Sequence, residues 1–191
     1  MLRHGSSVAN EGQRFGGWED VGLAERGIEQ ARHAGRLLRD TQTRWDIAFT
    51  SSLQRAIQTL DHCMAELIDP LPTVSDWRLN ERHYGRLQGM SKAEAASLYG
   101  AECVQAWRRS FRARPPQLTF DEYLSVAGSQ VRIPRGESLM DTQQRVLGCW
   151  RDRIHPALMS RQKSSRQTRR FVGNKGRRCR PSLSCFPFPM P

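Results

Sequence analysis

An arginine and a histidine stand side by side near the start of the chain, in Arg3-His4-Gly5. A neutral imidazole can attack a phosphoryl group and form a phosphohistidine, which divides one difficult transfer into two easier ones. The neighbouring guanidinium offers a planar fork of donors that matches the oxygens of a phosphate. Because a packed or capping histidine is the more frequent explanation of such a tripeptide, the phosphoryl-transfer interpretation depends on the residues that accompany it.

Further blocks of residues follow this tripeptide in a fixed order. They are Ser6 to Asn10 with Phe15-Gly16-Gly17-Trp18, Phe49-Thr50-Ser51 with Arg55-Ala56, Trp77 to Gly85, Leu87 to Glu94, Trp107 to Ser110, and Glu137-Ser138-Leu139 with Asp141-Thr142. Together they resemble the motifs of the histidine phosphatase superfamily and, within it, of the cofactor-dependent phosphoglycerate mutases. The similarity spans residues 2 to about 159, and the block from Leu79 to Gly85 is its most specific part.

The resemblance implies a role for each polar residue in these blocks. His4 would be the nucleophile, and Glu81 would take the proton from the attacking hydroxyl and return it to the leaving oxygen. A ring of cations and N–H groups would stabilise the charge that spreads over the phosphoryl oxygens. The substrate-binding residues implied are Arg3, Asn10, Gly16, Gly17, Arg55, Arg82, His83, Tyr84, Lys92, Arg108 and Arg109. Without the resemblance, Arg55, Arg108 and Arg109 would equally be solvated charges on helix surfaces.

The implied activity is that of an isomerase, an intramolecular phosphotransferase that interconverts 2-phosphoglycerate and 3-phosphoglycerate in glycolysis and gluconeogenesis. 2,3-Bisphosphoglycerate would supply the priming phosphoryl group, and no metal would take part. The expected partners are small phosphoglycerates, with no membrane and no specific nucleic acid, and a homodimer is compatible with the resemblance. Two alternatives stay open: a histidine-type phosphatase of small phosphorylated metabolites, in which water accepts the phosphoryl group, and an inactive fragment whose basic tail binds polyanions.

The chain departs from the family pattern at both ends. Family members carry a late strand that leads to a His-Gly-Asn motif, and none of the five histidines here fits it. Ser6 stands where a glutamate or glutamine is usual, and Gly16 stands where a hydroxyl is expected to touch the phosphate. The strand that presents His4 is expected to be short, because only Met1 and Leu2 precede Arg3.

The positive charge is concentrated in the C-terminal tail. The net charge is +11, and residues 160–191 contain nine lysines and arginines but no acidic residue, which leaves +2 on residues 1–159. The tail lacks the interleaved aromatic residues of a nucleic-acid module, and prolines crowd its last residues. We predict an incomplete catalytic domain over 1–159 and a tail over 160–191 that is disordered or out of frame. A one-base shift permits Gln167–Gly173 to read Arg-His-Gly-Asp-Ser-Leu-Gly, which resembles the missing His-Gly-Asn motif. We therefore expect a frameshift from about residue 161 on.

Hydrophobic periodicity predicts an α/β fold for the part before the tail. The spacing of Ile28, Ala31 and Leu38 predicts a helix over 25–39. Residues 46–50 form a short apolar run typical of a buried strand, and Ser51-Ser52 are expected to cap a helix with Leu53, Ile57, Leu60, Met64 and Leu67 on its buried face. Further helices are expected over 91–99, 101–111 and 138–154, and a long loop or lid over 112–135.

The expected architecture is a three-layer sandwich with a mostly parallel central sheet, like that of the phosphoglycerate mutases, from which the C-terminal part is missing. The composition, 38% hydrophobic and 26% charged, suffices for the core of one domain. No apolar run is long enough to cross a bilayer. Five cysteines without a Cys-x-x-Cys pair fit reduced thiols in a cytoplasm.

Overall fold

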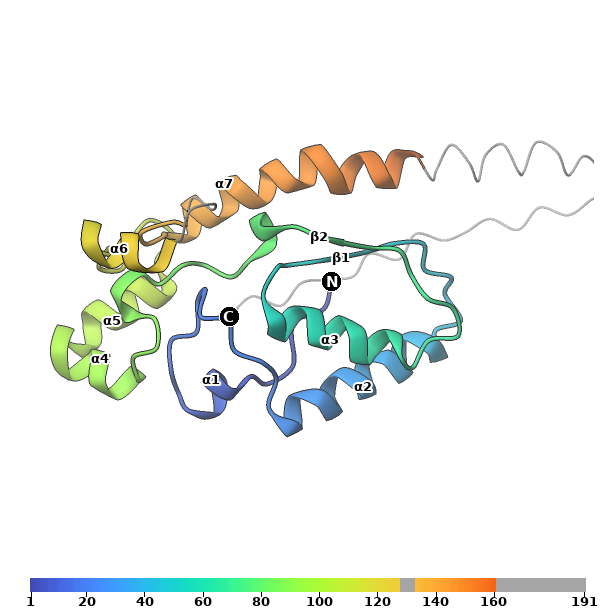
Figure 1. Cartoon of the computed structure of the whole chain (residues 1–191), viewed down its shortest axis with the longest axis horizontal. Helices are drawn as coiled ribbons and strands as arrows, with labels where there is room; N and C mark the ends of the chain where they lie inside the picture. The colour runs from blue at the N-terminus through green and yellow to red at the C-terminus, as the bar shows by residue number, and fades with distance from the viewer. Residues whose placement is uncertain (128–132, 161–191) are drawn as a thin grey trace, which may run out of the picture. The chain divides into compact units, whose positions relative to one another are not determined.

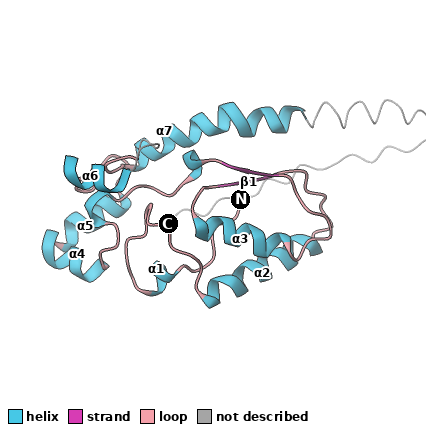
Figure 2. Ribbon diagram, in the orientation of Figure 1, coloured by secondary structure: helices cyan, strands magenta, loops and turns pink. Residues whose placement is uncertain are grey.

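The computed structural model describes residues 1–127 and 133–160. One compact unit comprises Met1–Ile154, and a second unit, His155–Pro191, contributes only residues 155–160, which are helical. The expected frameshift from about residue 161, the missing His-Gly-Asn motif and most of the basic tail therefore concern positions outside the described residues. Figures 1 and 2 show the elements of the first unit, which follow the order α1 (Val8–Glu11), α2 (Glu25–Asp40), β1 (Ala48–Thr50), α3 (Gln54–Met64), β2 (Thr73–Ser75), η1 (Trp77–Leu79), η2 (Gly85–Leu87), α4 (Lys92–Tyr99), α5 (Ala101–Arg109), α6 (Phe120–Ala127), α7 (Leu139–Cys149) and the π-helical turn η3 (Trp150–Ile154).

The sheet of the described residues consists of two parallel strands. β1 pairs with β2 in the register Ala48 to Thr73 and Thr50 to Ser75. The α/β class and the parallel pairing are confirmed. The two strands of the described residues do not by themselves make up the three-layer sandwich that we expected. A parallel pair requires a crossover connection, and α3 supplies it between the two strands.

No strand leads to His4 in this structure, so that expectation is wrong. Residues 1–6 have no regular structure, and Ser7 forms only an isolated antiparallel bridge with Leu23. The backbone groups of this segment bind side chains instead: the Gly5 N–H donates to Thr59 Oγ1 at 3.0 Å, and the Ser6 N–H donates to Gln30 Oε1 at 2.9 Å. The segment is therefore held by helices α2 and α3 rather than by a neighbouring strand.

Helices α2 and α3 lie side by side and pack through small residues (Figure 1). Gly27, Ala31 and Gly35 are buried on α2, as its periodicity predicted for Ala31. A Cβ on Gly35 would lie 2.5 Å from the carbonyl oxygen of Cys63, so the backbones of the two helices approach closely at this point. The absence of a side chain at Gly35 thus permits the short distance between the two helices.

The buried face of α3 differs from the one expected. Arg55, Thr59 and Cys63 are buried. Of the residues expected on the buried face, Leu53 is buried, whereas Ile57, Leu60, Met64 and Leu67 are only half-buried. The prediction failed because apolar periodicity cannot anticipate that a guanidinium and a hydroxyl will find buried partners. These two polar side chains face the segment that carries His4, so α3 contributes its polar stripe to the site.

The cap of α3 also comes from elsewhere in the chain. The N-cap position is Leu53, which makes no side-chain cap. Asp20 Oδ1 accepts from the Gln54 N–H at 2.6 Å, while Ser52 donates both its N–H and its hydroxyl to Asn80 Oδ1. Only Ser51 acts near its expected place, accepting from the Leu53 N–H at 3.3 Å.

The remaining helices follow the predictions, with one addition. α4 and α5 occupy the predicted ranges, and α7 passes into the turn η3 within the predicted 138–154. The region expected to be a loop or lid over 112–135 contains α6, which begins with reciprocal bonds between Thr119 and Glu122. Among the described residues, Cys63, Cys103 and Cys149 are free thiols. No helix in the described part of the chain is both long and apolar enough to cross a membrane.

Candidate active site

The backbone around His4 is fixed by close packing against α2 and α3. Thr59 Oγ1 accepts from the Gly5 N–H and donates in turn to the carbonyl oxygen of Arg55 at 2.7 Å. A Cβ on Gly27 would overlap the carbonyl oxygen of Ser6, and one on Gly5 would overlap that of Gly27. Only glycines permit this approach, so α2 and α3 together determine where the His4 side chain starts.

The His4 imidazole is oriented as a nucleophile. Its Nδ1 lies 2.7 Å from the carbonyl oxygen of Gly5, which can only accept, so Nδ1 carries the proton and the neutral ring presents its lone pair on Nε2. Burial lowers the pKa of His4, and the nearby positive charges of Arg55 and Arg3 lower it further, against the opposing effects of the Gly5 carbonyl and Glu81. The ring is therefore neutral at pH 7.

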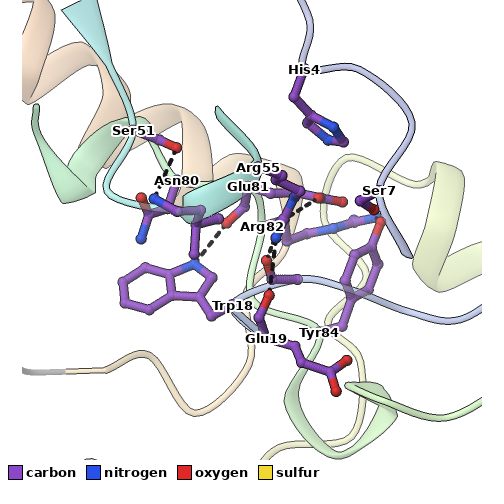
Figure 3. Close-up of polar contacts among 12 residues, drawn as sticks. His4, Ser7, Trp18, Glu19, Ser51, Arg55, Asn80, Glu81, Arg82 and Tyr84 are labelled. Atoms are coloured by element: carbon purple, nitrogen blue, oxygen red, sulfur yellow. Dashed lines mark hydrogen bonds and ion pairs between the residues drawn. The ribbon is translucent and has the colours of Figure 1, made fainter. Parts of the chain in front are cut away.

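Arg55 is anchored beneath His4 by backbone oxygens. Its guanidinium, 2% exposed, donates to the carbonyl oxygens of Gly17 at 2.6 Å and Glu19 at 3.0 Å, and to Glu81 Oε2 at 3.0 Å. Gly17 has a φ of +54°, a conformation that favours glycine. Figure 3 shows Arg55, Glu81 and Arg82 gathered on the side toward which the His4 ring points.

Arg82 is a buried cation with spare donors. It is 4% exposed, its Nη2 donates to the carbonyl oxygen of Arg108 at 3.2 Å, and its guanidinium carbon lies 4.8 Å from the centre of the Tyr84 ring. Its Nε and Nη1 are buried and have no partner among the described residues. Unpaired buried N–H groups are costly, but these two atoms are as closed to solvent as the His83 ring, so they reach no bound anion in this conformation.

His83 occupies a different environment from the substrate-binding one that we expected. Its side chain is fully buried, Nδ1 accepts from the Gly85 N–H at 3.0 Å, and the ring lies 5.8 Å from that of Trp18. Burial lowers the pKa of His83 to about 4. The ring is therefore a neutral group packed beneath the site. Because its side chain is inaccessible to solvent, it cannot contact substrate in this conformation.

The other expected ligands lie around this group at varying distances. The Asn10 side chain caps α1 by accepting from the N–H and hydroxyl of Ser7, and Lys92 Nζ donates to Gln13 Oε1 at 3.1 Å. A Cβ on Gly16 would lie 4.0 Å from Arg55 Nη2, so Gly16 borders the cation. Arg109 is exposed and Arg108 half-exposed, and in the described ranges neither side chain has a hydrogen-bonding partner. The structure thus brings together His4, Arg3, Arg55 and Glu81.

A cavity of about 220 Å³ lies beside His4, lined by Leu2, Arg3, His4, Gly5, Gln30, Ala31, Ala34 and Thr59. A larger one of about 350 Å³ lies away from His4, between η2, α4 and α6. Within residues 1–127 and 133–160, no group of three or more His, Cys, Asp or Glu side chains could hold a metal ion.

Several residues that build the site carried no expected role. Thr59 positions the His4 backbone, Trp18 donates its indole Nε1–H to the carbonyl oxygen of Glu81 at 2.7 Å, and Arg145 and Glu137 hold the segment around Glu81. Trp18 and Glu137 had a signal in the sequence, because each stands in one of the matched blocks. The others act through contacts distant in sequence.

Comparisons with known proteins show the family to which the chain is similar. The sequence profile of the histidine phosphatase superfamily (branch 1) matches residues 1–158. Among solved structures, mycobacterial hydrolase 1 is 30% identical, with a TM-score of 0.58 over 76% of this chain and 57% of its own. A mycobacterial glucosyl-3-phosphoglycerate phosphatase in complex with VO3 is 28% identical, with a TM-score of 0.60 over 85% of this chain and 64% of its own. The chain thus spans less than two thirds of the length of these two proteins.

Proposed function

Because the chain belongs to branch 1 of the histidine phosphatase superfamily, we propose that it transfers phosphoryl groups of small phosphorylated metabolites through a phosphohistidine at His4. The observation that carries the proposal is the tautomer of His4. Its Nδ1–H is bound to the Gly5 carbonyl, which leaves the Nε2 lone pair available beside Arg55 and Glu81.

The reaction then takes two steps. His4 Nε2 attacks phosphorus, the bond from phosphorus to the leaving oxygen breaks, and the Glu81 carboxyl group gives its proton to that oxygen. In the second step Glu81 takes a proton from the acceptor oxygen, which attacks the phosphohistidine and frees the imidazole. The positive charges of Arg55 and Arg82 would stabilise the charge on the transferring group.

The acceptor distinguishes two candidate activities. A phosphoglycerate mutase returns the phosphoryl group to a second hydroxyl of glycerate, and 2,3-bisphosphoglycerate would prime His4. A phosphatase uses water, and the similarity to a glucosyl-3-phosphoglycerate phosphatase favours this candidate. A water acceptor needs fewer contacts with the protein than a hydroxyl of glycerate, which must be correctly placed. The observed site agrees with both the mutase and the phosphatase activity.

The other expectations of the resemblance belong to the same proposal. They are the cytoplasmic location, the homodimer, the absence of a metal cofactor and of a specific nucleic-acid partner, and a sheet that extends the β1 and β2 pair into a three-layer sandwich. The parallel pairing and the helical crossover α3 support the last of these.

Labelling of His4 tests the proposal. The purified chain is incubated with 2,3-bisphosphoglycerate or 3-phosphoglycerate, and mass spectrometry locates an acid-labile phosphate. We expect the label on His4 and its loss in His4→Ala, but not in His33→Ala, which changes an exposed histidine on α2. Label on another residue, or none on a folded chain, overturns the proposal.

The product then separates the candidates. Formation of 2-phosphoglycerate from 3-phosphoglycerate indicates a mutase, and release of inorganic phosphate indicates a phosphatase; both are followed by ³¹P NMR. The inactive-fragment alternative predicts no label, together with retention on heparin that depends on residues 160–191.

A further inference from the structure

The segment that carries Glu81 has no regular secondary structure of its own. Residues 81–84 lie between the short turns η1 and η2 and belong to neither a helix nor a strand. The backbone groups of such a segment must find partners elsewhere in the molecule. Those partners determine where the Glu81 carboxylate stands relative to His4.

One arginine of α7 binds the chain at Glu81 and just before it. Arg145 Nη1 donates to the carbonyl oxygens of Arg78 at 2.8 Å and Asn80 at 2.7 Å, and its Nη2 donates to that of Glu81 at 2.8 Å. The guanidinium carbon also lies 5.6 Å from the centre of the Trp18 ring, whose indole N–H bonds to the same Glu81 carbonyl. A single planar cation thus fixes the Glu81 carbonyl and two carbonyls of the turn that precedes it.

A buried carboxylate completes the arrangement. Glu137 accepts from Arg145 Nε at 2.7 Å and from its Nη2 at 2.8 Å, and the side chains are 9% exposed for Arg145 and 6% for Glu137. Glu137 Oε2 also accepts from the backbone N–H of His83 at 2.8 Å. Two fork-shaped groups therefore hold the segment: the Arg145 guanidinium binds the Glu81 carbonyl, and the Glu137 carboxylate binds the amide two residues later.

We propose that Arg145 and Glu137 are positioning residues that hold the Glu81 carboxyl group in place to give its proton to the leaving oxygen. The proposal rests on the function proposed above. A buried ion pair contributes little net stability compared with apolar replacements. Here, however, the pair contacts five backbone and side-chain groups at fixed points, so its contribution is to position them. A lysine at position 145 would keep the charge but lose the planar fork, so it isolates the geometric contribution.

The test compares two substrates that differ in their need for a proton. The leaving oxygen of 3-phosphoglycerate requires one, whereas that of 2,4-dinitrophenyl phosphate is stable without it. In Arg145→Lys and Glu137→Gln we expect the rate of His4 labelling by 3-phosphoglycerate to fall about 100-fold, at the lower end of what a positioned proton donor contributes. Labelling by 2,4-dinitrophenyl phosphate should change by less than about threefold, since no proton transfer is involved.

Arg114→Lys is the matched control. Arg114 forms the same kind of fork with Asp141, at 2.7 and 2.6 Å, near the start of α7, but its side chain is 51% exposed and it contacts no carbonyl of the Glu81 segment. We expect this variant to label like the wild type with both substrates. Equal losses with both substrates, or equal losses in the control, overturn the proposal.

A measurement that needs no activity accompanies the kinetics. The indole N–H resonance of Trp18, assigned by its absence in Trp18→Phe, reports the bond to the Glu81 carbonyl. It should shift in Arg145→Lys and Glu137→Gln but not in Arg114→Lys; an unchanged resonance in both variants overturns the proposal. If the wild-type chain is labelled by neither substrate, the proposed function fails and the catalytic part of this inference fails with it, while the indole resonance still decides whether Arg145 holds the segment.

Discussion

Arg55 and Glu81 form an ion pair of 3.0 Å in which the arginine side chain is 2% exposed and the glutamate side chain 40% exposed. The cation is fixed by the carbonyl oxygens of Gly17 and Glu19, so it cannot follow the carboxylate if that group moves. The carboxylate in turn stays accessible to solvent while one of its oxygens is held. A fixed arginine paired with an accessible carboxylate suits a proton carrier, because the glutamate is anchored at one oxygen and can still reach a bound substrate.

Replacing Arg55 should cost both stability and activity. Arg55→Met keeps the hydrophobic stem but leaves two carbonyls and Glu81 without their donor, so we expect the free energy of unfolding in urea to fall by about 3 kcal/mol and His4 labelling to slow by about 100-fold or more. Arg36→Met is the control, because the ion pair of Arg36 with Glu66 is longer and more exposed; it should change stability by less than about 1 kcal/mol. Similar losses in both variants would contradict the assigned role of Arg55.

Two helical glycines should respond to alanine with opposite signs. Alanine is favoured over glycine in a helix by about 1 kcal/mol, and Gly148→Ala in α7 has room for the methyl group, whose nearest neighbour is Arg78 Nη1 at 3.7 Å. We expect it to stabilise the chain. Gly27→Ala drives a methyl group into the Ser6 carbonyl, so it should destabilise by about 2 kcal/mol. Thermal and urea unfolding measure both; a stabilised Gly27→Ala would rule out the close contact.

The hydroxyl of Thr59 can be tested with a pair of variants. Thr59→Val keeps the shape but leaves the buried Gly5 N–H without an acceptor, which should lower the free energy of unfolding by about 1–3 kcal/mol. Thr59→Ser keeps the hydroxyl and should lie closer to the wild type. Urea unfolding at pH 7 measures both variants, and a valine variant as stable as the serine variant would show that the bond to Gly5 contributes nothing.

His83 should make the stability depend on pH. Its pKa in the folded chain is about 4, below the ordinary value of 6.5, because the ring is buried. Between these values the unfolded chain binds a proton that the folded chain does not, so stability falls as the pH is lowered through this window. From pH 7 to pH 5 the loss attributable to His83 amounts to about 2 kcal/mol.

His83→Asn isolates that contribution, since its side-chain oxygen can still accept from the Gly85 N–H. We expect the wild type to lose about 2 kcal/mol more than this variant between pH 7 and pH 5. The effect of His4, whose pKa is also lowered, is common to both proteins and cancels in the comparison. Parallel urea-unfolding profiles would mean that His83 is not buried as a neutral ring.

The sequence was most informative where structure is local. α2, α4 and α5 lie where periodicity predicted them, and α6 was overlooked although Thr119 and Glu122 form a readable capping box. The predicted strand before His4 was wrong because the partners of that backbone lie on α2 and α3, distant in sequence. Periodicity likewise placed the buried face of α3 on its apolar side chains.

For the site, the resemblance identified residues that the fold brings together, but not those that hold them. His4, Arg55 and Glu81 come from three separate blocks and meet in the structure. Arg145 carried no motif, and the carbonyls that it binds lie 64 to 67 residues away. The burial of His83 was hidden for the same reason, since it depends on Glu137 and Trp18.

The contact between Gly27 and Ser6, together with the bond from Gly5 to Thr59, has a consequence for local opening. Residues near a chain end commonly fray and exchange their amide hydrogens quickly. The Gly5 amide cannot reach solvent unless its segment separates from α2 and α3, because its hydrogen is buried against both helices. We therefore expect the backbone beside His4 to open only together with the helix pair, so that the Gly5 amide exchanges with the amides of α2 and α3 rather than with those of a frayed chain end.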